Sequence, residues 1–511
     1  MDSTGPRAAP QHSTRCIPCE ELELARVHDT RPVQTLPVPA AALAGFPEGR
    51  SGAGVTRRRL LQYGVAGFAS VYGPKMLGWE SIWEAAAAEA LAPTNNVLVV
   101  LYLAGGNDGL NTIVPNAPAD YNKYVQLRPA IHRGQGPTAG GVVGSMPIPA
   151  TGGNLAFANP VVSSAGGGDN GDANFGFDTL YGDGLGGASS DLAILPAVDY
   201  MPPNLSHFES SDYWFSGALA QLSTGWLGRW LDAYGSHTNP LQAVSLDTAL
   251  SKSIRTSSAP VCAISSFSAL GFSMRPPSGG YGSPGGTPSA VDANTQIRNL
   301  AGVPAGAGNA HLARSRSTYS SAVDVFGSAG SLSGGAQGSG YPAGSQLAGK
   351  LKMAAQLLGA NLGTRVVTIH WGSMDTHGGQ ISQQDPQLVQ LSRCLGAFKA
   401  DLQARGVEQK VATLVFSEFG RRVGENDSGG TDHGAGGLML MSGSGVKGGY
   451  AAPFPGLGTL DDDGDVLVPT DFRSVYQAVI NEWLGGDPAA VLPGGSFPGI
   501  TRYDGTTGLF G

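Results

Sequence analysis

The sequence has few charged residues, and this scarcity limits the classes of protein that fit it. Asp, Glu, Lys and Arg make up 14% of the 511 residues, against roughly 25% in an average soluble domain. Disorder driven by charge needs a high charged content with few hydrophobic residues, whereas 41% of this chain is hydrophobic. The composition therefore excludes an intrinsically disordered chain and indicates a packed core.

Cysteine is also scarce, with four in the whole chain. Cys16 and Cys19 form a CxxC pair, but no second pair follows at zinc-site spacing. Cys262 and Cys394 allow at most one disulfide, which excludes a disulfide-dense scaffold.

A concentrated basic surface is missing from the body of the chain. Residues 1–92 hold nine Lys or Arg and nine Asp or Glu, so the net charge of −8 falls on residues 93–511. An acidic body argues against nucleic acid as a partner, because nucleic acid requires clustered positive charge.

The N-terminal segment is typical of export. The run Thr56-Arg57-Arg58-Arg59-Leu60-Leu61-Gln62 precedes a weakly apolar stretch, Tyr63–Gly73, and the alanines Ala85–Ala88. This order resembles a twin-arginine leader; the alternative is a chance arginine triplet before a buried helix. The apolar stretch is shorter than the roughly 20 residues of a membrane span, so we expect no stable span. We predict that residues 1–92 are an N-terminal extension with a twin-arginine signal, that the export machinery is a partner, and that the protein is periplasmic or extracellular.

Glycine and proline, by contrast, are abundant, with 78 and 34 residues. They gather in stretches within about 134–190 and 271–344 that show no repeat period. We interpret these stretches as surface loops or partly ordered insertions in a single domain, residues 93–511.

Apolar runs alternate with helical patterns along the body. The runs are Asn96–Leu103, Leu192–Val198, Leu241–Leu246, Arg365–Trp371, Val411–Ser417 and Leu438–Ser442. The helical patterns are Tyr121–Ile131, Thr224–Tyr234, Gln346–Leu362, Asp385–Arg405 and Asp471–Leu484. Buried strands alternating with helices predict an α/β fold whose mainly parallel central sheet is flanked by helices.

Polar clusters follow these predicted strands. Because ligands bind beyond the carboxyl ends of the strands in open α/β sheets, residues at those ends are candidates for a site. The candidates are imidazoles and carboxylates, which bind Zn or other divalent ions: His207, His377, His433, Asp108, Asp375, Glu418 and Asp432. Each has a structural alternative. Asp108 suits an Asx turn, Asp375 could cap a turn, and Glu418 could pair locally with Arg421 or Arg422.

Ser206 has two interpretations at one position. Ser206-x-x-Glu209 is a capping box, in which the serine hydroxyl bonds the Glu209 amide. The alternative is a nucleophile, because the N–H groups and positive dipole end of a helix N-terminus suit a phosphoryl or sulfuryl group.

Several motifs in order resemble the domain-of-unknown-function 1501 family. They are Asn107-Asp108-Gly109-Leu110-Asn111, Ser206-His207-Phe208-Glu209, Thr224-Gly225-Trp226-Leu227-Gly228-Arg229, Asp375-Thr376-His377, Ser417-Glu418-Phe419-Gly420-Arg421-Arg422 and Gly430-Thr431-Asp432-His433-Gly434. The resemblance covers about residues 95–486. That family is grouped with the alkaline phosphatase and sulfatase superfamily, which implies a metal site at the carboxyl edge of the sheet. By motif, Asp108, Asp375, His377, Glu418 and His433 match metal ligands.

Two departures from the superfamily bear on activity. In the superfamily the mid-chain Asp and His are usually four residues apart, whereas Asp375 and His377 are two apart. The superfamily also has an Asp-His pair late in the chain, and here Glu418-Phe419 takes its place, so one imidazole is missing. The chain also lacks the Cys-x-Pro-x-Arg context of formylglycine sulfatases.

The sequence thus supports two hypotheses. The first is an exported hydrolase of small-molecule or polymer phosphate or sulfate esters that depends on a divalent metal (Zn, Mg or Ca). In it Asp108, Asp375, His377, Glu418, Asp432 and His433 hold the metal. Ser206 or water attacks, and Arg421 or Arg422 holds the ester oxygens. The alternative is a non-catalytic exported binding or assembly protein that retains the fold.

Overall fold

The computed structural model describes residues 95–511 except 149–150, 152–153, 183–190, 238 and 267–339. The chain divides into two units, residues 1–62 and 63–511, and every described residue belongs to the second. The predicted twin-arginine segment, and all of the insertion predicted at 271–344 except its last five residues, lie outside the described residues. The predicted domain boundary at residues 92 and 93 stays a prediction.

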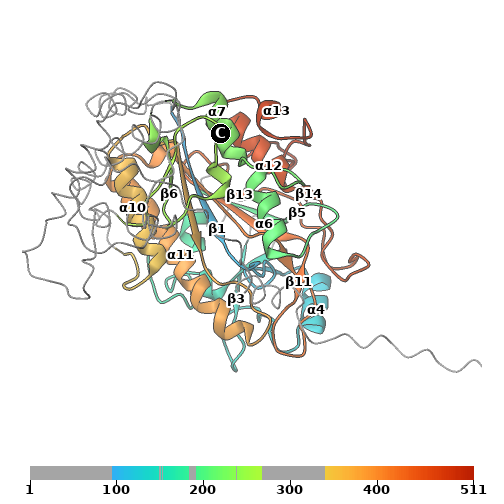
Figure 1. Cartoon of the computed structure of the whole chain (residues 1–511). Helices are drawn as coiled ribbons and strands as arrows, with labels where there is room; N and C mark the ends of the chain where they lie inside the picture. Colours follow the sequence, from blue (N-terminus) through green and yellow to red (C-terminus); the bar gives the residue numbers. More distant parts are fainter. Residues whose placement is uncertain (1–94, 149–150, 152–153, 183–190, 238, 267–339) are drawn as a thin grey trace, which may run out of the picture. The chain divides into compact units, whose positions relative to one another are not determined.

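A nine-stranded sheet forms the centre of this unit (Figure 1). The strand order is β13-β5-β12-β9-β1-β8-β6-β7, and β14 also pairs with β5. The strands are β1 (Val97–Leu103), β5 (Leu192–Asp199), β6 (Ala243–Ser245), β7 (Cys262–Ala263), β8 (Val366–Trp371), β9 (Val411–Phe416), β12 (Gly437–Ser442), β13 (Gly449–Tyr450) and β14 (Thr470–Asp471).

Most neighbouring strands are parallel, which confirms the predicted α/β class. β1 is parallel to β8 and β9, and β6 is parallel to β8 and β7. β12 is the exception, because it is antiparallel to both β5 and β9. The chain turns back after β9 through the short ladder of β10 (Gly420–Arg421) and β11 (His433–Gly434). Since no crossover helix intervenes, the next strand returns in the opposite direction.

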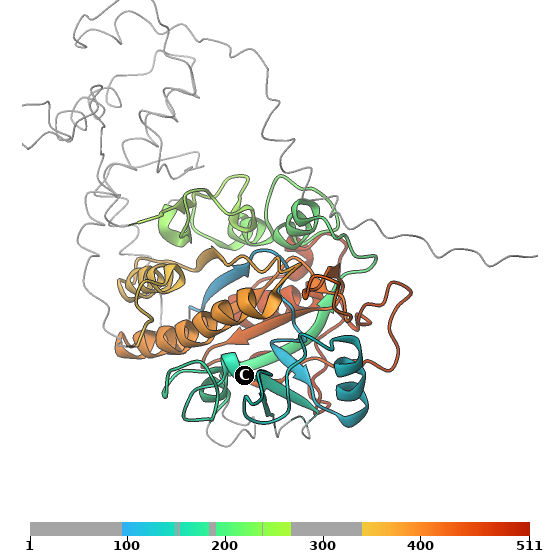
Figure 2. The same ribbon diagram turned by 90° about the horizontal axis from the view of Figure 1, so that it is seen from below.

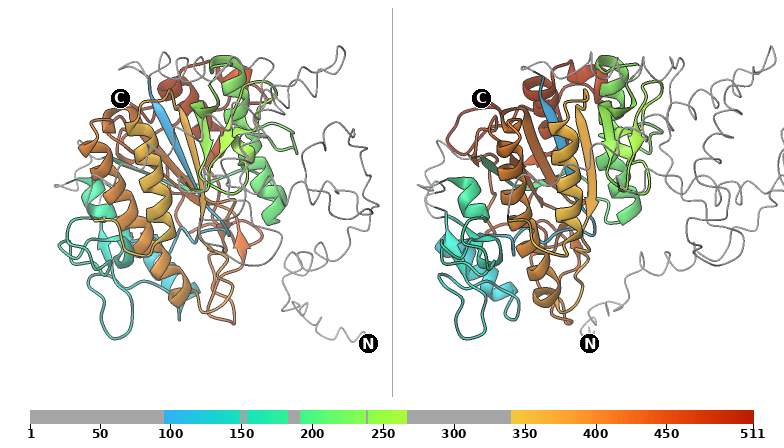
Figure 3. Two further views of the ribbon diagram at one scale, coloured as in Figure 1. Left: turned by 60° about the vertical axis from the view of Figure 1, so that its left-hand side comes forward. Right: turned by 90° about the vertical axis from the view of Figure 1, so that its left-hand side faces the viewer.

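Helices cover both faces of the sheet (Figures 1 and 3). They are α4 (Pro118–Leu127), α5 (Phe177–Tyr181), α6 (His207–Ser216), α7 (Trp226–Tyr234), α10 (Gln346–Gly359), α11 (Gln380–Ala404), α12 (Phe472–Ala478) and α13 (Pro488–Val491). Short 3-10 helices lie at Asn159–Val161, Pro240–Gln242, Lys252–Ile254 and Glu408–Lys410, and a π-helix, Val479–Leu484, continues α12.

Alternation along β1 divides the core between the two faces. Val99 and Leu101 belong to the cluster that contains residues of α10 and α11. Val100 and Tyr102 belong to the cluster that contains residues of α6, α7 and α12. A strand buried on both faces in this way reads as a continuous apolar run, as the sequence does here.

The described part of the insertion predicted at 134–190 contains regular secondary structure, which fits a partly ordered insertion better than a surface loop. Its described part contains β3 (Ser145–Pro147) and β4 (Leu155–Ala158), which pair with β2 (Ile113–Pro115) in a small antiparallel sheet. Figure 2 shows the described part of this segment, in teal, gathered on one side of α11. Every residue of β4 is buried, so this strand contributes to the core rather than to the surface.

Two remaining expectations concern cysteine and the membrane. Cys262 and Cys394 are both free and buried. Within the described ranges no helix has the length and apolar character needed to cross a bilayer; the stretch Tyr63–Gly73 lies outside them.

Candidate metal centre

The topology brings polar loops together at one edge of the sheet. The carboxyl ends of β1, β8 and β9 meet there because these strands are parallel. The loop after β8 carries Asp375, the end of β9 leads to Glu418, and β12 starts at this edge just after His433. His207 is the first residue of α6, which follows β5.

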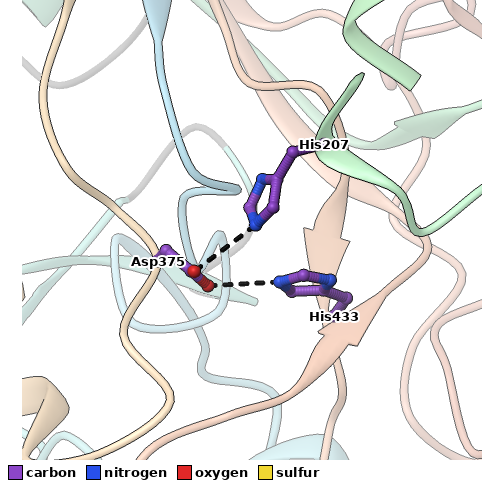
Figure 4. Close-up of side chains that lie close together, drawn as sticks. All are labelled: His207, Asp375 and His433. Carbon is purple, nitrogen blue, oxygen red and sulfur yellow. Dashed lines mark hydrogen bonds and ion pairs between the residues drawn. The ribbon is translucent and has the colours of Figure 1, made fainter. Parts of the chain in front are cut away.

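His207, Asp375 and His433 form the centre of the cluster (Figure 4). Nε2 of His207 lies 3.3 Å from Oδ2 of Asp375, and Nε2 of His433 lies 3.1 Å from Oδ1. One ligand atom from each residue lies within 4.8 Å of the others, a spacing that fits a metal ion. The structure thus brings together His433 and Asp375, two of the residues predicted as metal ligands.

His377 adds a third imidazole. Its Nε2 lies 3.0 Å from Oδ1 of Asp375 and 3.0 Å from Nε2 of His433. Three imidazole nitrogens therefore face one carboxylate, and such a set of nitrogen and oxygen donors suits Zn²⁺ better than Mg²⁺ or Ca²⁺.

The opposite ring nitrogen of each histidine is fixed by an oxygen acceptor. Nδ1 of His207 donates to Glu418 at 2.8 Å, and Nδ1 of His377 donates to Asp432 at 2.9 Å. Nδ1 of His433 donates to the Leu205 carbonyl oxygen at 2.9 Å. These outer contacts keep a proton on Nδ1, so Nε2, which faces Asp375, is the ring nitrogen that would bind an ion once its own proton is released.

Glu418 and Asp432, both predicted as ligands, therefore lie outside the inner donor set. Glu418 is 1% exposed and also accepts hydrogen bonds from the backbone amides of Gly105 (2.8 Å) and Gly106 (3.2 Å). Gly105 has φ +109°, and a Cβ there would lie 2.5 Å from the Asp375 nitrogen. A residue with a side chain would push the loop after β1 away from the centre.

Asp375 and the positively charged groups around it shift one another's pKa values. Burial alone would raise the pKa of Asp375, but hydrogen bonds from the three histidines and Arg421 hold it far below its ordinary value. Burial alone would lower the pKa of His207, but Asp375 and Glu418 raise it to about 9. The hydrogen bond to Asp375 also raises the pKa of His377, whereas burial lowers that of His433. The Asp375 carboxylate is thus ionised, and in the ion-free protein its charge is already paired with Arg421 and His207.

Arg421 orients this carboxylate. Its Nη2 lies 2.8 Å from Oδ1 of Asp375, and its guanidinium donates to four carbonyl oxygens, those of Gly105, Gly106, Met374 and Thr431. The side chain is fully buried. The sequence predicts that Arg421 binds an ester oxygen. Because these contacts engage its Nε and both Nη atoms, Arg421 is not placed for that role. Arg422 points elsewhere and pairs with Asp465 at 3.5 Å.

Asp108 lies outside the cluster. Its carboxylate is paired with the fully buried Arg128, with Nη1 2.5 Å from Oδ2, and it also accepts from the amide of Gln380. Its Oδ1 accepts from the Leu110 amide at 3.1 Å, the hydrogen bond of an Asx turn. The contacts favour the structural alternative, not the predicted ligand role.

Ser206 stands where both of its interpretations place it, at the N-cap of α6. Its side chain makes no capping hydrogen bond, and Glu209 instead accepts from the Asn204 side chain at 2.6 Å. The predicted capping box is therefore absent, and the hydroxyl lies next to His207 in sequence without a capping partner.

Sequence reasoning named His207 among the strand-end histidines but not among the ligands implied by the family motifs. Its position on the first turn of a helix that follows a buried strand was the available signal. Arg128, Leu205 and Asn426 carried no signal, because their roles depend on contacts with residues far away in the sequence.

The comparisons with known proteins bear on the family of the chain and not on its activity. No curated protein and no solved structure matches the chain significantly. Residues 331–475 match the model of the family described as "Protein of unknown function (DUF1501)". This matched region holds Asp375, His377, Glu418, Arg421 and His433, while His207 lies before it.

Proposed function

We propose that this protein is an exported metal-dependent hydrolase of phosphate or sulfate esters with an alkaline phosphatase-like fold. The observation that carries the proposal is the convergence of three imidazole Nε2 atoms on Asp375, with each Nδ1 bonded to an outer oxygen. That arrangement supports one divalent ion, with Zn²⁺ favoured by the donors.

His207, His377, His433 and Asp375 are the residues that would hold the ion. A bound divalent ion supplies Lewis-acid polarisation of an ester oxygen. Arg421 keeps the Asp375 carboxylate aimed at the three imidazoles, and Glu418 keeps the His207 ring aimed at Asp375.

The N-terminus of α6 is the part of the site suited to bind the substrate. The first amides of a helix lack intrahelical partners and favour anions, and Ser206 provides no side-chain cap for them. These amides are suited to bind the non-bridging ester oxygens, with Ser206 or water as the nucleophile.

A hydrolysis assay tests the proposal. The protein loaded with Zn²⁺ is incubated with chromogenic phosphate and sulfate esters, with His433→Ala as a control lacking one ligand. We expect turnover by the wild type that a chelator abolishes and the control lacks. An ion-loaded wild type with no turnover above buffer would refute the hydrolase.

One observation favours a second candidate, a non-catalytic exported binding or assembly protein. Four protein donors surround the centre, and closed four-ligand sites are typical of structural zinc. The same assay separates the two, because the second candidate binds the ion without turnover.

A further inference from the structure

The three imidazoles are held by outer partners of very different burial. Glu418, which holds His207, is 1% exposed, whereas Asp432, which holds His377, is 60% exposed. Hydrogen bonds between charged groups at the surface are weakened by water. His377 is therefore held by a weaker contact than His207.

The His433 ring has the most buried position of the three. Its side chain is 5% exposed, against 27% for His377. Its outer partner is the carbonyl oxygen of Leu205, a backbone atom with less freedom to move than an exposed side chain. His433 thus belongs to the rigid part of the centre.

Asn426 connects His377 to the loop that holds it. Its Nδ2 donates to the His377 carbonyl oxygen at 2.9 Å and to Oδ1 of Asp432 at 3.0 Å. Its Oδ1 accepts from the amides of Ser428 (3.0 Å) and Gly430 (3.1 Å). One amide side chain therefore shapes the loop from residue 426 to 432 and orients Asp432 toward His377.

We propose that His377 is the exchangeable ligand of the metal centre, and that Asn426 and Asp432 are positioning residues that set how tightly it is held. The inference rests on the proposed function, because it requires the ion. His207, Asp375 and His433 form a three-ligand group without His377, and catalytic zinc sites keep three protein ligands and one open position. Release of His377 opens the fourth position to an ester oxygen.

Matched variants separate this role from a general effect of charge on the loop. Asp432→Asn removes the carboxylate that holds His377. Asn426→Asp keeps the acceptor for the loop amides but places a second carboxylate beside Asp432. Asp427→Asn is the control, because this exposed residue lies in the same loop and the described residues give its side chain no hydrogen bond or ion pair.

The experiment measures Zn²⁺ content and Kd of the full-length protein by elemental analysis and chelator competition. His377→Ala should keep one ion per chain with a Kd raised about 10- to 100-fold, and Asp432→Asn and Asn426→Asp should raise it about 10-fold. Asp427→Asn should match the wild type, and His433→Ala should bind no ion. Circular dichroism of each ion-free variant checks folding, and His377→Gln replaces His377→Ala if the latter does not fold.

Two results would overturn the assignment of His377. Loss of the ion from His377→Ala, as from His433→Ala, would make it an essential ligand, and an unchanged Kd would show that it is no ligand. A Kd unchanged in Asn426→Asp or Asp432→Asn would remove that residue from the account. A wild type that binds no ion refutes the proposed function together with the inference, whereas binding without hydrolysis refutes only the hydrolase.

Discussion

At the scale of single residues, Arg421 links the metal centre to the fold. Its guanidinium joins the loops after β1 and β8 through the carbonyls of Gly105, Gly106 and Met374, and it also contacts Asp375. A buried charge that loses its partner is costly, typically by about 3–5 kcal/mol.

Arg421→Met should destabilise the ion-free protein by about 3 kcal/mol, because it leaves four buried carbonyl oxygens without their donor and removes one of the four partners of Asp375. Urea denaturation of the variant measures this loss. Arg393→Met is the matched control and should cost less than about 1 kcal/mol, because its pair with Asp172 is long, at 3.4 Å, and both side chains are partly exposed, at 27% and 14%. Equal losses in the two variants would show that Arg421 does not organise the centre.

Ser206→Ala separates structure from chemistry at the start of α6. Because the hydroxyl makes no capping bond, we expect the free energy of unfolding to change by less than about 0.5 kcal/mol. A capping serine would cost about 1 kcal/mol, so a loss of that size contradicts the observed geometry. Turnover measured on the same variant shows whether Ser206 or water is the nucleophile.

The residue types of the site were predictable, but their arrangement in inner and outer positions was not. His377 and His433 stand in loops after apolar runs, and this pattern is visible in the sequence. Glu418 reaches Nδ1 of His207 across 211 positions of the chain, and no local pattern encodes that distance. A carboxylate that holds a histidine has the same sequence signature as one that binds a metal.

At the scale of elements, the junction of β5 and β12 contains a buried acid. Asp199 is fully buried at the end of β5, and its Oδ2 accepts from the Gly436 amide at 3.1 Å. Burial raises the pKa of its carboxyl to about 8, and burial likewise raises that of nearby Asp465 to about 6. The folded protein therefore retains protons that the unfolded chain releases.

The sign of the resulting pH dependence follows from linkage. Because the folded pKa lies above the unfolded value of about 3.9, the stabilisation is complete below pH 4 and is lost as the pH rises toward 8. We expect Asp199 to lower the free energy of unfolding of the ion-free protein between pH 5 and 8 by up to about 1.4 kcal/mol per pH unit, and Asp465 to add to this slope below about pH 6. Asp199→Asn should flatten this slope, and Asp427→Asn should not. A wild-type stability that is constant or rises over this range would contradict the account.

Elements were predicted best where burial is uniform. Runs such as Val411–Phe416 are apolar because both faces are covered, and this pattern indicates a strand without giving its direction. The antiparallel direction of β12 depends on the turn after β9, which the pattern does not contain. α11 begins at Gln380, before the predicted start at Asp385, because Pro386 is accommodated inside the helix although proline usually marks a beginning.

At the scale of the whole molecule, export remains a prediction carried by Arg57 and Arg58. Replacing both with Lys preserves the charge but removes the paired arginines, so precursor should accumulate in the cytoplasm. Immunoblots of cell fractions measure this. Undiminished export of the double variant would refute the twin-arginine route.

The central claim is that the three histidines and Asp375 bind one divalent ion. Elemental analysis of the full-length protein after exposure to Zn²⁺ and desalting tests it most directly, with the double variant His433→Ala and Asp375→Ala and the control His132→Ala, a histidine bonded to the Arg128 carbonyl outside the cluster. The account predicts about one ion per chain in the wild type and the control, and none in the double variant. Equal metal content in all three proteins would contradict it.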